Sequence, residues 1–135
     1  MELCRLCVDP EYRNRPTMQL LWQSIASYVR RQKIEIRFGC ASFKGIEIEN
    51  LKVPLSYLYH YHLALRKLRP RAIIGRFVEL NRLPKADIDP IFTWKKFNPP
   101  IKGYLSLGGF VGDGALMDPQ FNTTDVSIIV KTDPY

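Results

Sequence analysis

The chain has 135 residues, enough for one domain with a buried core and too few for two comparable domains. Hydrophobic residues make up 46% of the sequence, which is typical of globular proteins and excludes an intrinsically disordered chain. The 20 lysines and arginines outnumber the 13 acids, and the formal charge of +7 suits an anionic partner such as a nucleic acid, an acidic protein or a membrane. We therefore expect a single basic domain over residues 1–135.

The first predicted element is a strand that begins at residue 2 or 3 and ends at Val8, because Asp9 and Pro10 interrupt it. A polar turn follows, and Pro16 is then expected in the first turn of a helix, where proline is favoured. The helix is predicted by apolar residues at helical spacing and by basic residues that complement its C-terminal dipole: Leu20, Leu21, Ile25, Tyr28, Val29, then Arg30, Arg31 and Lys33.

Residues 34–43 predict a second strand, with Ile34, Ile36 and Phe38 on one face and Gly39 at a bulge or a close backbone approach. Pro54 is expected to start a second helix over residues 54–69. The remaining segments are predicted as follows: a strand over 71–80, a proline-rich surface excursion or short helix over 84–100, a glycine-rich stretch, and a final strand over 126–130. This alternation of strands and helices predicts an α/β fold.

The cysteines Cys4, Cys7 and Cys40 do not predict a disulfide scaffold, because their number is odd and no secretory leader precedes them. Residues three apart on a strand point to opposite faces, and no second Cys or His pair stands near Cys4 and Cys7, so we expect no metal site. Cys4 and Cys7 are expected to be buried structural thiols, and Cys40 is expected to be a packing residue. No stretch reaches the roughly 20 apolar residues of a membrane span. The sequence therefore predicts a cytoplasmic protein, soluble or peripheral to a membrane.

A strand, a turn that reads V-x-P-x-x-R and a helix together resemble the acyl-donor half of the GCN5-related N-acetyltransferase superfamily. In the family pattern, R-x-x-G-x-G/A, backbone amides and the helix N-terminus bind the donor's pyrophosphate. Arg13 fits this pattern, whereas Pro16 and Met18 occupy the glycine positions. Further segments, spread in order from residue 10 to residue 130, resemble the ornithine N-acyltransferase branch, often labelled hemolysin-like: PEYRNRP, LLWQSIASYV, FGCASF, PLSYLYHYHLA and IKGYLSLGGFVGDGALMDPQFNTTDVSIIV.

The resemblance implies a partial acyltransferase fold, a mixed sheet flanked by helices that lacks the first strands, with this chain as the C-terminal, donor-binding portion. It implies transfer of a 3-hydroxyacyl group from acyl carrier protein to the α-amine of L-ornithine, which yields lyso-ornithine lipid. The donor substrate would be the acyl-phosphopantetheine of the carrier protein, with no permanently bound cofactor. The other substrate would be an amino acid, and no nucleic acid is expected as a partner.

The donor site that the resemblance implies consists of Val8, Arg13, Asn14, Arg15 and Thr17. Proline at position 16 removes one amide donor from the turn. A turn with fewer amide donors suits the single phosphodiester of carrier-bound pantetheine, with the two arginines left to bind phosphate or acidic carrier side chains. The alternative is a first-turn proline flanked by solvated arginines.

Attack of an amine on a thioester requires a base for the amine and hydrogen-bond donors for the oxyanion, which the resemblance places on backbone N–H groups near residues 6–8. No covalent enzyme intermediate is required, so Cys40 is not needed as a nucleophile. The candidates for a base or relay are His60, His62 and Glu2. On a helix the two histidines point in different directions, and a histidine beside an apolar face is commonly a core or rim residue.

The candidate acceptor residues follow the glycine-rich stretch. Asn122, Thr124 and Asp125 enter an apolar strand and are the preferred candidates for binding the ammonium groups of ornithine, whereas Asp113 between two glycines is more typical of a turn. A basic cluster is a candidate for docking the carrier protein or an anionic membrane, the alternative being a solvated face: Arg66, Lys67, Arg69 and Arg71.

Three other functions remain open from the sequence. The first is acylation of another amino acid such as glycine, which lacks the side-chain ammonium of ornithine. The second is an inactive fragment that only binds the carrier protein. The third is a nucleic-acid-binding domain in which Trp94 or the Tyr-His run stacks on bases, although the basic residues are dispersed and no recognition motif is present.

Overall fold

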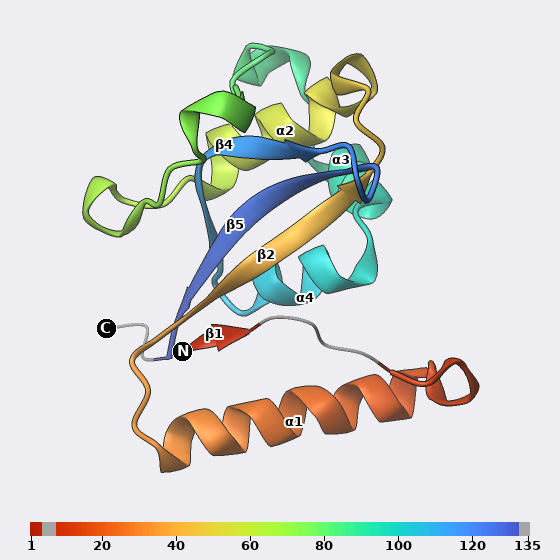
Figure 1. Ribbon diagram of the computed structural model, residues 1–135, viewed down its shortest axis with the longest axis vertical. Helices are drawn as coiled ribbons and strands as arrows, with labels where there is room; N and C mark the ends of the chain where they lie inside the picture. The colour runs from red at the N-terminus through yellow and green to blue at the C-terminus, as the bar shows by residue number, and fades with distance from the viewer. Residues whose placement is uncertain (4–7, 133–135) are drawn as a thin grey trace.

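One mixed sheet organises the computed structural model, which describes residues 1–3 and 8–132. The described strands lie in the order β1-β2-β5-β4-β3, with β1 parallel to β2 and all other neighbours antiparallel (Figure 1). Their bounds are β1 (Glu2–Leu3), β2 (Ile36–Lys44), β3 (Phe77–Val78), β4 (Phe110–Asp118) and β5 (Thr123–Lys131).

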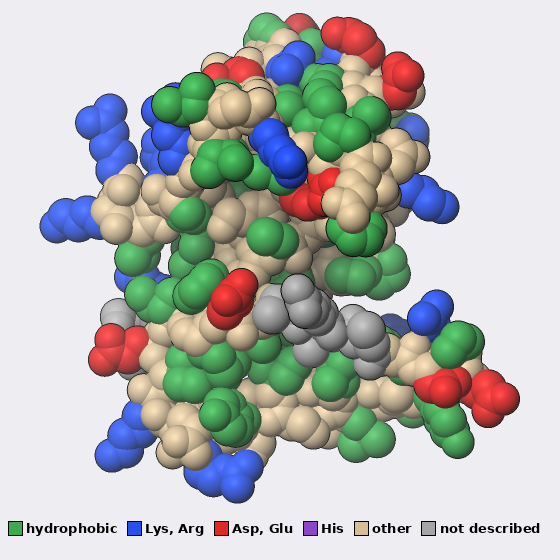
Figure 2. All heavy atoms as spheres, in the orientation of Figure 1, with side chains coloured by type: hydrophobic (Ala, Val, Ile, Leu, Met, Phe, Trp, Pro, Cys, Tyr) green, Lys and Arg blue, Asp and Glu red, His purple; other side chains and the backbone are tan. Residues whose placement is uncertain are grey.

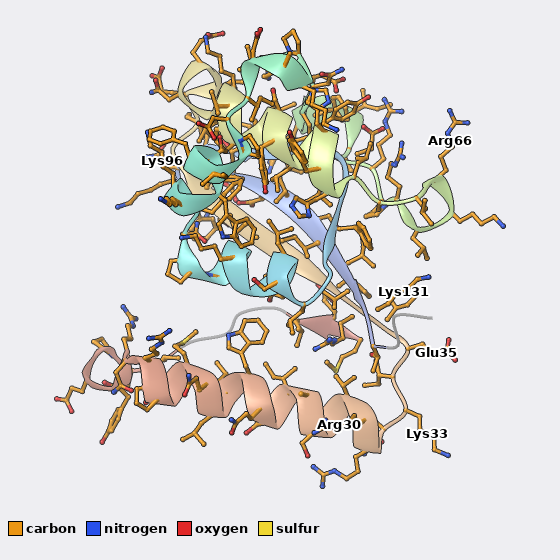
Figure 3. The ribbon with its side chains drawn as sticks, turned by 180° about the vertical axis from the view of Figure 1, so that it is seen from behind. Arg30, Lys33, Glu35, Arg66, Lys96 and Lys131 are labelled. Carbon is orange, nitrogen blue, oxygen red and sulfur yellow. The ribbon has the colours of Figure 1, made fainter. Side chains whose placement is uncertain are left out.

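Helices cover one face of this sheet. The helices are α1 (Arg15–Arg31), α2 (Ile48–His62), α3 (Pro90–Lys96) and α4 (Pro99–Ser106). Figures 1 and 3 show α2, α3 and α4 on the same face, α1 running beside the β1 edge, and no described helix over the opposite face. The predicted α/β fold, a mixed sheet flanked by helices, is confirmed.

Alternation along β2 separates the two faces. Every second residue from Arg37 to Phe43 is buried beneath the helices. The alternate residues from Phe38 to Lys44 are exposed, and Ile36 at the start of the strand is half-buried. Ile36 and Phe38 share a face as predicted, but it is the helix-free face, where Phe38 is 46% exposed. The core between sheet and helices is built from fully buried aliphatic residues of both layers: Leu55, Leu58, Leu80, Ile101, Val111, Ala115, Val126 and Ile128.

Local signals explain α1. The Asn14 side chain caps it by accepting a hydrogen bond from the Thr17 N–H at 2.9 Å, and Pro16 lies in its first turn as predicted. Arg30 and Arg31 occupy the last turn, as the charge pattern predicts. Of the residues of α1, all of which are described, Val29 alone is buried, so this helix is attached to the sheet by few contacts.

Two sequence predictions between residues 44 and 80 are wrong in extent. The second helix begins at Ile48 and ends at His62, with Pro54 inside it. An internal proline costs about 3 kcal/mol or more. Burial of Leu55 and Leu58 in the core offsets this cost. The strand predicted over 71–80 shortens to Phe77–Val78, and short 3-10 turns, η2 (Arg66–Leu68) and η3 (Ile74–Arg76), precede it.

The glycine-rich stretch forms β4, a strand that the sequence analysis does not predict. Val111 pairs with Ile128 and Ala115 with Val126, so residues 112–114 form a bulge opposite Ser127. Gly114 has φ +81° in this bulge. Asp113 therefore lies in a strand bulge, and the expectation of a turn is wrong. The final strand is confirmed in β5, and α3 confirms the short helix expected within residues 84–100.

Gly39 lies close to the backbone of β1, which agrees with the predicted close backbone approach. A Cβ atom at this position would lie 2.5 Å from the Leu3 carbonyl oxygen. We expect Gly39→Ala to lower the free energy of unfolding by roughly 1–3 kcal/mol through overpacking. Urea unfolding followed by circular dichroism measures this change. Gly75→Ala is the matched control, because a Cβ there meets no heavy atom within 4 Å. Equal stability of the two variants would contradict the expectation.

Candidate functional site

A cavity of about 390 Å³ opens between β2 and α1. Figure 2 shows the molecule hollowed between the start of α1 and the body of the protein. Three elements supply its described walls: α1, the middle of β2 and the start of α4. The lining residues are Leu3, Val8, Met18, Leu21, Trp22, Cys40, Ala41, Ser42, Asn98, Pro100 and Tyr104. We call this the donor cavity, because it adjoins the turn for which the sequence predicts a donor site.

The backbone of β2 faces this cavity on one side. The Gly45 N–H donates to the Asn122 carbonyl, and the Glu35 carbonyl accepts from the Thr132 N–H, so the odd-numbered residues of β2 hydrogen-bond with β5. The even-numbered residues therefore turn their N–H and C=O groups toward β1, as the Phe38 N–H does in bonding to the Met1 carbonyl at 2.9 Å. Described pairing with β1 ends at Gly39. Beyond it, the Ser42 carbonyl accepts from Asn98 Nδ2 at 3.2 Å.

The predicted donor residues gather around the start of α1. Val8 lines the donor cavity, and its carbonyl accepts from Arg13 Nε at 2.8 Å. The Thr17 N–H is occupied by the Asn14 cap, and Pro16 has no N–H, so few amides at this helix end are available to an anion. Arg15 is exposed at the first position of the helix. The structure thus leaves arginine side chains as the cationic groups beside the cavity.

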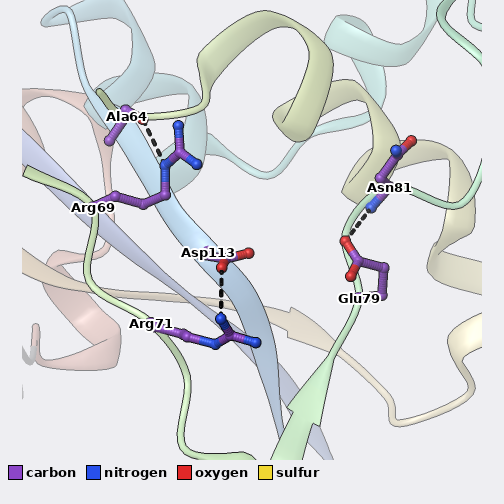
Figure 4. Close-up of polar contacts among 6 residues, drawn as sticks. All are labelled: Ala64, Arg69, Arg71, Glu79, Asn81 and Asp113. Carbon is purple, nitrogen blue, oxygen red and sulfur yellow. Dashed lines mark hydrogen bonds and ion pairs between the residues drawn. The ribbon is translucent and has the colours of Figure 1, made fainter. Parts of the chain in front are cut away.

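A second, smaller cavity of about 220 Å³ lies on the helix-free face of the sheet and brings two predicted acceptor residues together. Asp113 and Asp125 both line it, and Cys40 borders it as well as the donor cavity. Asp125 Oδ1 accepts from the Ser42 hydroxyl at 2.7 Å, and Asp113 Oδ2 lies 3.7 Å from Arg71 Nη1 (Figure 4). We call this the acidic pocket. Cys40 is exposed.

The other two predicted acceptor residues lie apart from this pocket. Thr124 is fully buried, and its hydroxyl donates to the Gly45 carbonyl at 2.9 Å. Asn122 has φ +53° in the β4–β5 turn, and its carbonyl accepts from the Gly45 N–H at 2.7 Å. Both residues hold the turn that leads from β2 to α2.

The two histidines lie on α2 and are not among the residues that line either cavity. His60 Nε2 donates to the Leu83 carbonyl at 2.8 Å. His62 stacks between Tyr57 and Trp94, with ring centroids 5.4 Å and 6.5 Å away. Burial lowers the pKa of His62 below its ordinary value, so the imidazole is neutral at pH 7. These contacts agree with the alternative of core or rim histidines.

Several further expectations concern the first strand. Glu2 is exposed in β1, opposite Phe38 of β2. Cys4, Cys7 and the backbone groups near residue 6 lie outside the described residues. Within residues 1–3 and 8–132, no group of three or more His, Cys, Asp or Glu side chains is arranged to hold a metal ion. No helix in the same ranges has the length and apolar character needed to cross a membrane.

Sequence reasoning missed the residues that close the donor cavity on the α4 side. Trp22 packs edge-on against Tyr104, with ring centroids 5.2 Å apart. Asn98 caps α4 by accepting from the Ile101 N–H at 3.1 Å and also reaches β2. The Asn-Pro-Pro run does signal a helix start. That local signal does not predict the hydrogen bond from the Asn98 side chain to the Ser42 carbonyl, because the two residues are far apart in the chain.

The environment of His62 predicts a pH dependence of stability. The pKa of His62 is lowered in the folded state. The neutral imidazole therefore contributes to the free energy of unfolding fully above the unfolded-state pKa of about 6.5, and this contribution is lost as the pH falls. We expect the melting temperature to drop less between pH 7.5 and pH 5.5 in His62→Gln than in the unsubstituted chain, by calorimetry. An equal drop would show that His62 does not contribute.

Comparison with known proteins gives close relatives. The chain is 44% identical over 132 residues to the L-ornithine N(alpha)-acyltransferase of Rhodobacter capsulatus, which is 98% of this chain and 50% of the relative. Proteins of the same name from Brucella abortus and Agrobacterium fabrum are 42% and 39% identical, over 96% of this chain and 46% and 44% of their own lengths. No family model and no solved structure matches.

The chain thus spans about half the length of the curated relatives it matches. The resemblance drawn from the segments between residues 10 and 130 is confirmed, because the matches cover nearly all of the chain. Over the half of their length that it spans, the chain is similar to the L-ornithine N(alpha)-acyltransferases at 39–44% identity.

Proposed function

We propose that this chain forms the donor-binding part of an enzyme that transfers an acyl group from the phosphopantetheine of acyl carrier protein to the α-amine of ornithine, and so makes a lyso-ornithine lipid. The observation that carries the proposal is the donor cavity, which lies between the middle of β2 and a helix start flanked by arginines. The name of the relatives supports ornithine as the acceptor and acyl transfer as the reaction.

The donor arm would lie in this cavity. Pantetheine contains two amides, and amides form hydrogen bonds with the backbone groups of a strand. Cys40, Ala41 and Ser42 are the residues of β2 that line the cavity. The phosphate end would lie at the start of α1, bound by the side chains of Arg13 and Arg15. A single phosphodiester requires fewer amide donors than a pyrophosphate, in agreement with the capped, proline-bearing helix start.

The acidic pocket supplies the acceptor side. Asp113 and Asp125 would accept hydrogen bonds from the ammonium groups of ornithine. Asp113 already contacts Arg71, whereas no described cation pairs with Asp125. Glycine lacks a side-chain ammonium, so a pocket with two carboxylates favours ornithine. Because Cys40 borders both cavities, the two substrates would approach each other near the middle of β2.

In the proposed reaction the neutral α-amine attacks the thioester carbon, the C–N bond forms, and the C–S bond breaks. The amine proton passes to a base, for which Glu2, His60 and His62 remain the candidates, and the pantetheine thiolate takes up a proton. Tyr104 lines the donor cavity, and burial raises the pKa of its phenol, which stays protonated at neutral pH. We propose Tyr104 as the donor to the thiolate.

The test uses a chimera, because this chain spans half of its relatives' length. The 132 matched residues of the Rhodobacter capsulatus relative are exchanged for those of this chain and expressed in a bacterium that makes no ornithine lipid. Mass spectrometry of the lipids should detect N-acyl ornithine. An active relative combined with a folded but inactive chimera would refute the proposed function for this chain.

Asp125→Asn tests the acceptor site in the purified chimera. The substitution removes the charge and keeps an oxygen that accepts from Ser42. We expect KM for ornithine to rise roughly tenfold or more, since a hydrogen bond to a charged group contributes about 1.5–3 kcal/mol. Asp118→Asn, at the β4–β5 turn, is the control and should leave KM unchanged. An unchanged KM in both variants would exclude Asp125 from ornithine binding.

Arg15→Gln tests the donor site in the same assay. Loss of one phosphate contact should raise KM for the acyl carrier protein roughly threefold to tenfold at low salt and change kcat little. Arg30→Gln removes the same charge from the other end of α1 and serves as the control. Equal effects of the two substitutions would mean that only the overall charge matters, and the site at the start of α1 would be rejected.

A further inference from the structure

The segment between α2 and β3, residues 63–76, carries five cations and no acid. We call it the basic loop. Its cations are Arg66, Lys67, Arg69, Arg71 and Arg76. Its two 3-10 turns, η2 and η3, lie on the same side of the molecule (Figure 1), and Figure 3 shows Arg66 projecting from the body of the protein. The basic loop is thus a concentrated positive surface at one side of the fold.

The backbone of the basic loop is fixed on the edge of β4. The Ala64 N–H donates to the Val111 carbonyl at 2.9 Å, and the Ala72 N–H donates to the Asp113 carbonyl at 3.0 Å. The Asp113 N–H returns a bond to the Pro70 carbonyl at 2.7 Å. Arg69 and Arg71 add side-chain contacts, to the Ala64 carbonyl and to Asp113 (Figure 4). Two of the five cations therefore stabilise the loop itself.

Three large aliphatic side chains point outward from this fixed backbone. Ile74 is 92% exposed, Leu65 is 72% exposed and Ile73 is 63% exposed. Their positions are set by the bonds to β4, and they stand in the same segment as the cations Arg66, Lys67 and Arg76. Several exposed apolar side chains in one short segment indicate an interaction surface.

We propose that the basic loop docks this protein on an anionic lipid surface. Leu65, Ile73 and Ile74 would enter the boundary between headgroups and acyl chains, and the three cations not used internally would bind lipid phosphates. An acidic protein would satisfy the cations, but a lipid surface satisfies both the cations and the aliphatic tips, which is why the lipid is favoured. This proposal does not depend on the acyl transfer proposed above.

The experiment is sedimentation of the purified chain with vesicles of phosphatidylcholine alone and of phosphatidylcholine mixed with phosphatidylglycerol. The chain should bind the anionic vesicles, bind neutral ones weakly, and be released by salt. Arg66→Gln with Lys67→Gln should lower the partition coefficient roughly 30-fold, from about 1 kcal/mol for each charge near the surface. Ile73→Ser with Ile74→Ser should lower it at least about tenfold. Circular dichroism verifies that each variant is folded.

Matched controls place the same changes elsewhere. Arg30→Gln with Arg31→Gln removes equal charge from α1. Ile91→Ser with Phe92→Ser removes two exposed apolar residues from α3, which are 71% and 57% exposed. Both should bind vesicles like the unsubstituted chain. Loss of binding in the α3 variant alone, or no binding to anionic vesicles, would overturn the proposal.

The chimera with the Rhodobacter capsulatus relative provides a further vesicle-binding experiment. Vesicle binding by the chimera that is lost on Ile73→Ser with Ile74→Ser would support the proposal. Binding by the isolated chain but not by the chimera would show that the rest of the protein covers the basic loop. Binding of an acidic carrier protein to the loop, without any binding to anionic vesicles, would assign the surface to a protein partner. Either of these last two results would overturn the proposal.

Discussion

The candidate site depends on the pairing of β2 with β5. Toward β5 the strand is paired at every residue from Ile36 to Lys44, and toward β1 the described pairing joins Glu2 and Leu3 to Phe38 and Gly39. β2 is therefore held along its whole length by β5. A strand held in this way presents backbone groups in fixed positions, so little conformational entropy is lost when a ligand binds to them.

The α1 wall of the donor cavity is weakly packed. Among the fully described residues of α1, Val29 alone is buried, and the Trp22–Tyr104 ring contact ties the helix to α4. By contrast, α2 places Leu55 and Leu58 in the centre of the core. Elements with little buried surface open locally at low free energy, which suits a cavity that must admit a substrate arm attached to a carrier protein.

The period-two alternation of a strand also explains how one strand can border both cavities. The even-numbered residues of β2 direct their backbone groups toward the β1 side, where Cys40 and Ser42 line the donor cavity, and their side chains onto the helix-free face. Ser42 combines both directions, because its carbonyl accepts from Asn98 while its hydroxyl donates to Asp125. Under the proposed function, this geometry is what would bring the acyl donor and the amine acceptor to the same strand.

Local signals in the sequence were sufficient for α1, β2 and β5, because a capping asparagine, a first-turn proline and apolar periodicity act within a few residues. The same kind of signal failed at β4, where the glycines of the bulge look like turn residues and the strand is stabilised by β5 and the distant basic loop. It failed at Pro54 for the same reason, since core burial outweighed a local preference.

The sequence by itself therefore determined the α/β class, the resemblance to the ornithine N-acyltransferases and the kinds of side chain available for the chemistry. Only the tertiary structure decided which of them meet. Asp113 and Asp125 share a pocket because a bulge in β4 sets the register against β5, while Thr124, one residue earlier, points to the other face and holds the Gly45 turn. Such neighbours are fixed by strand register and packing between distant segments, which no local pattern encodes.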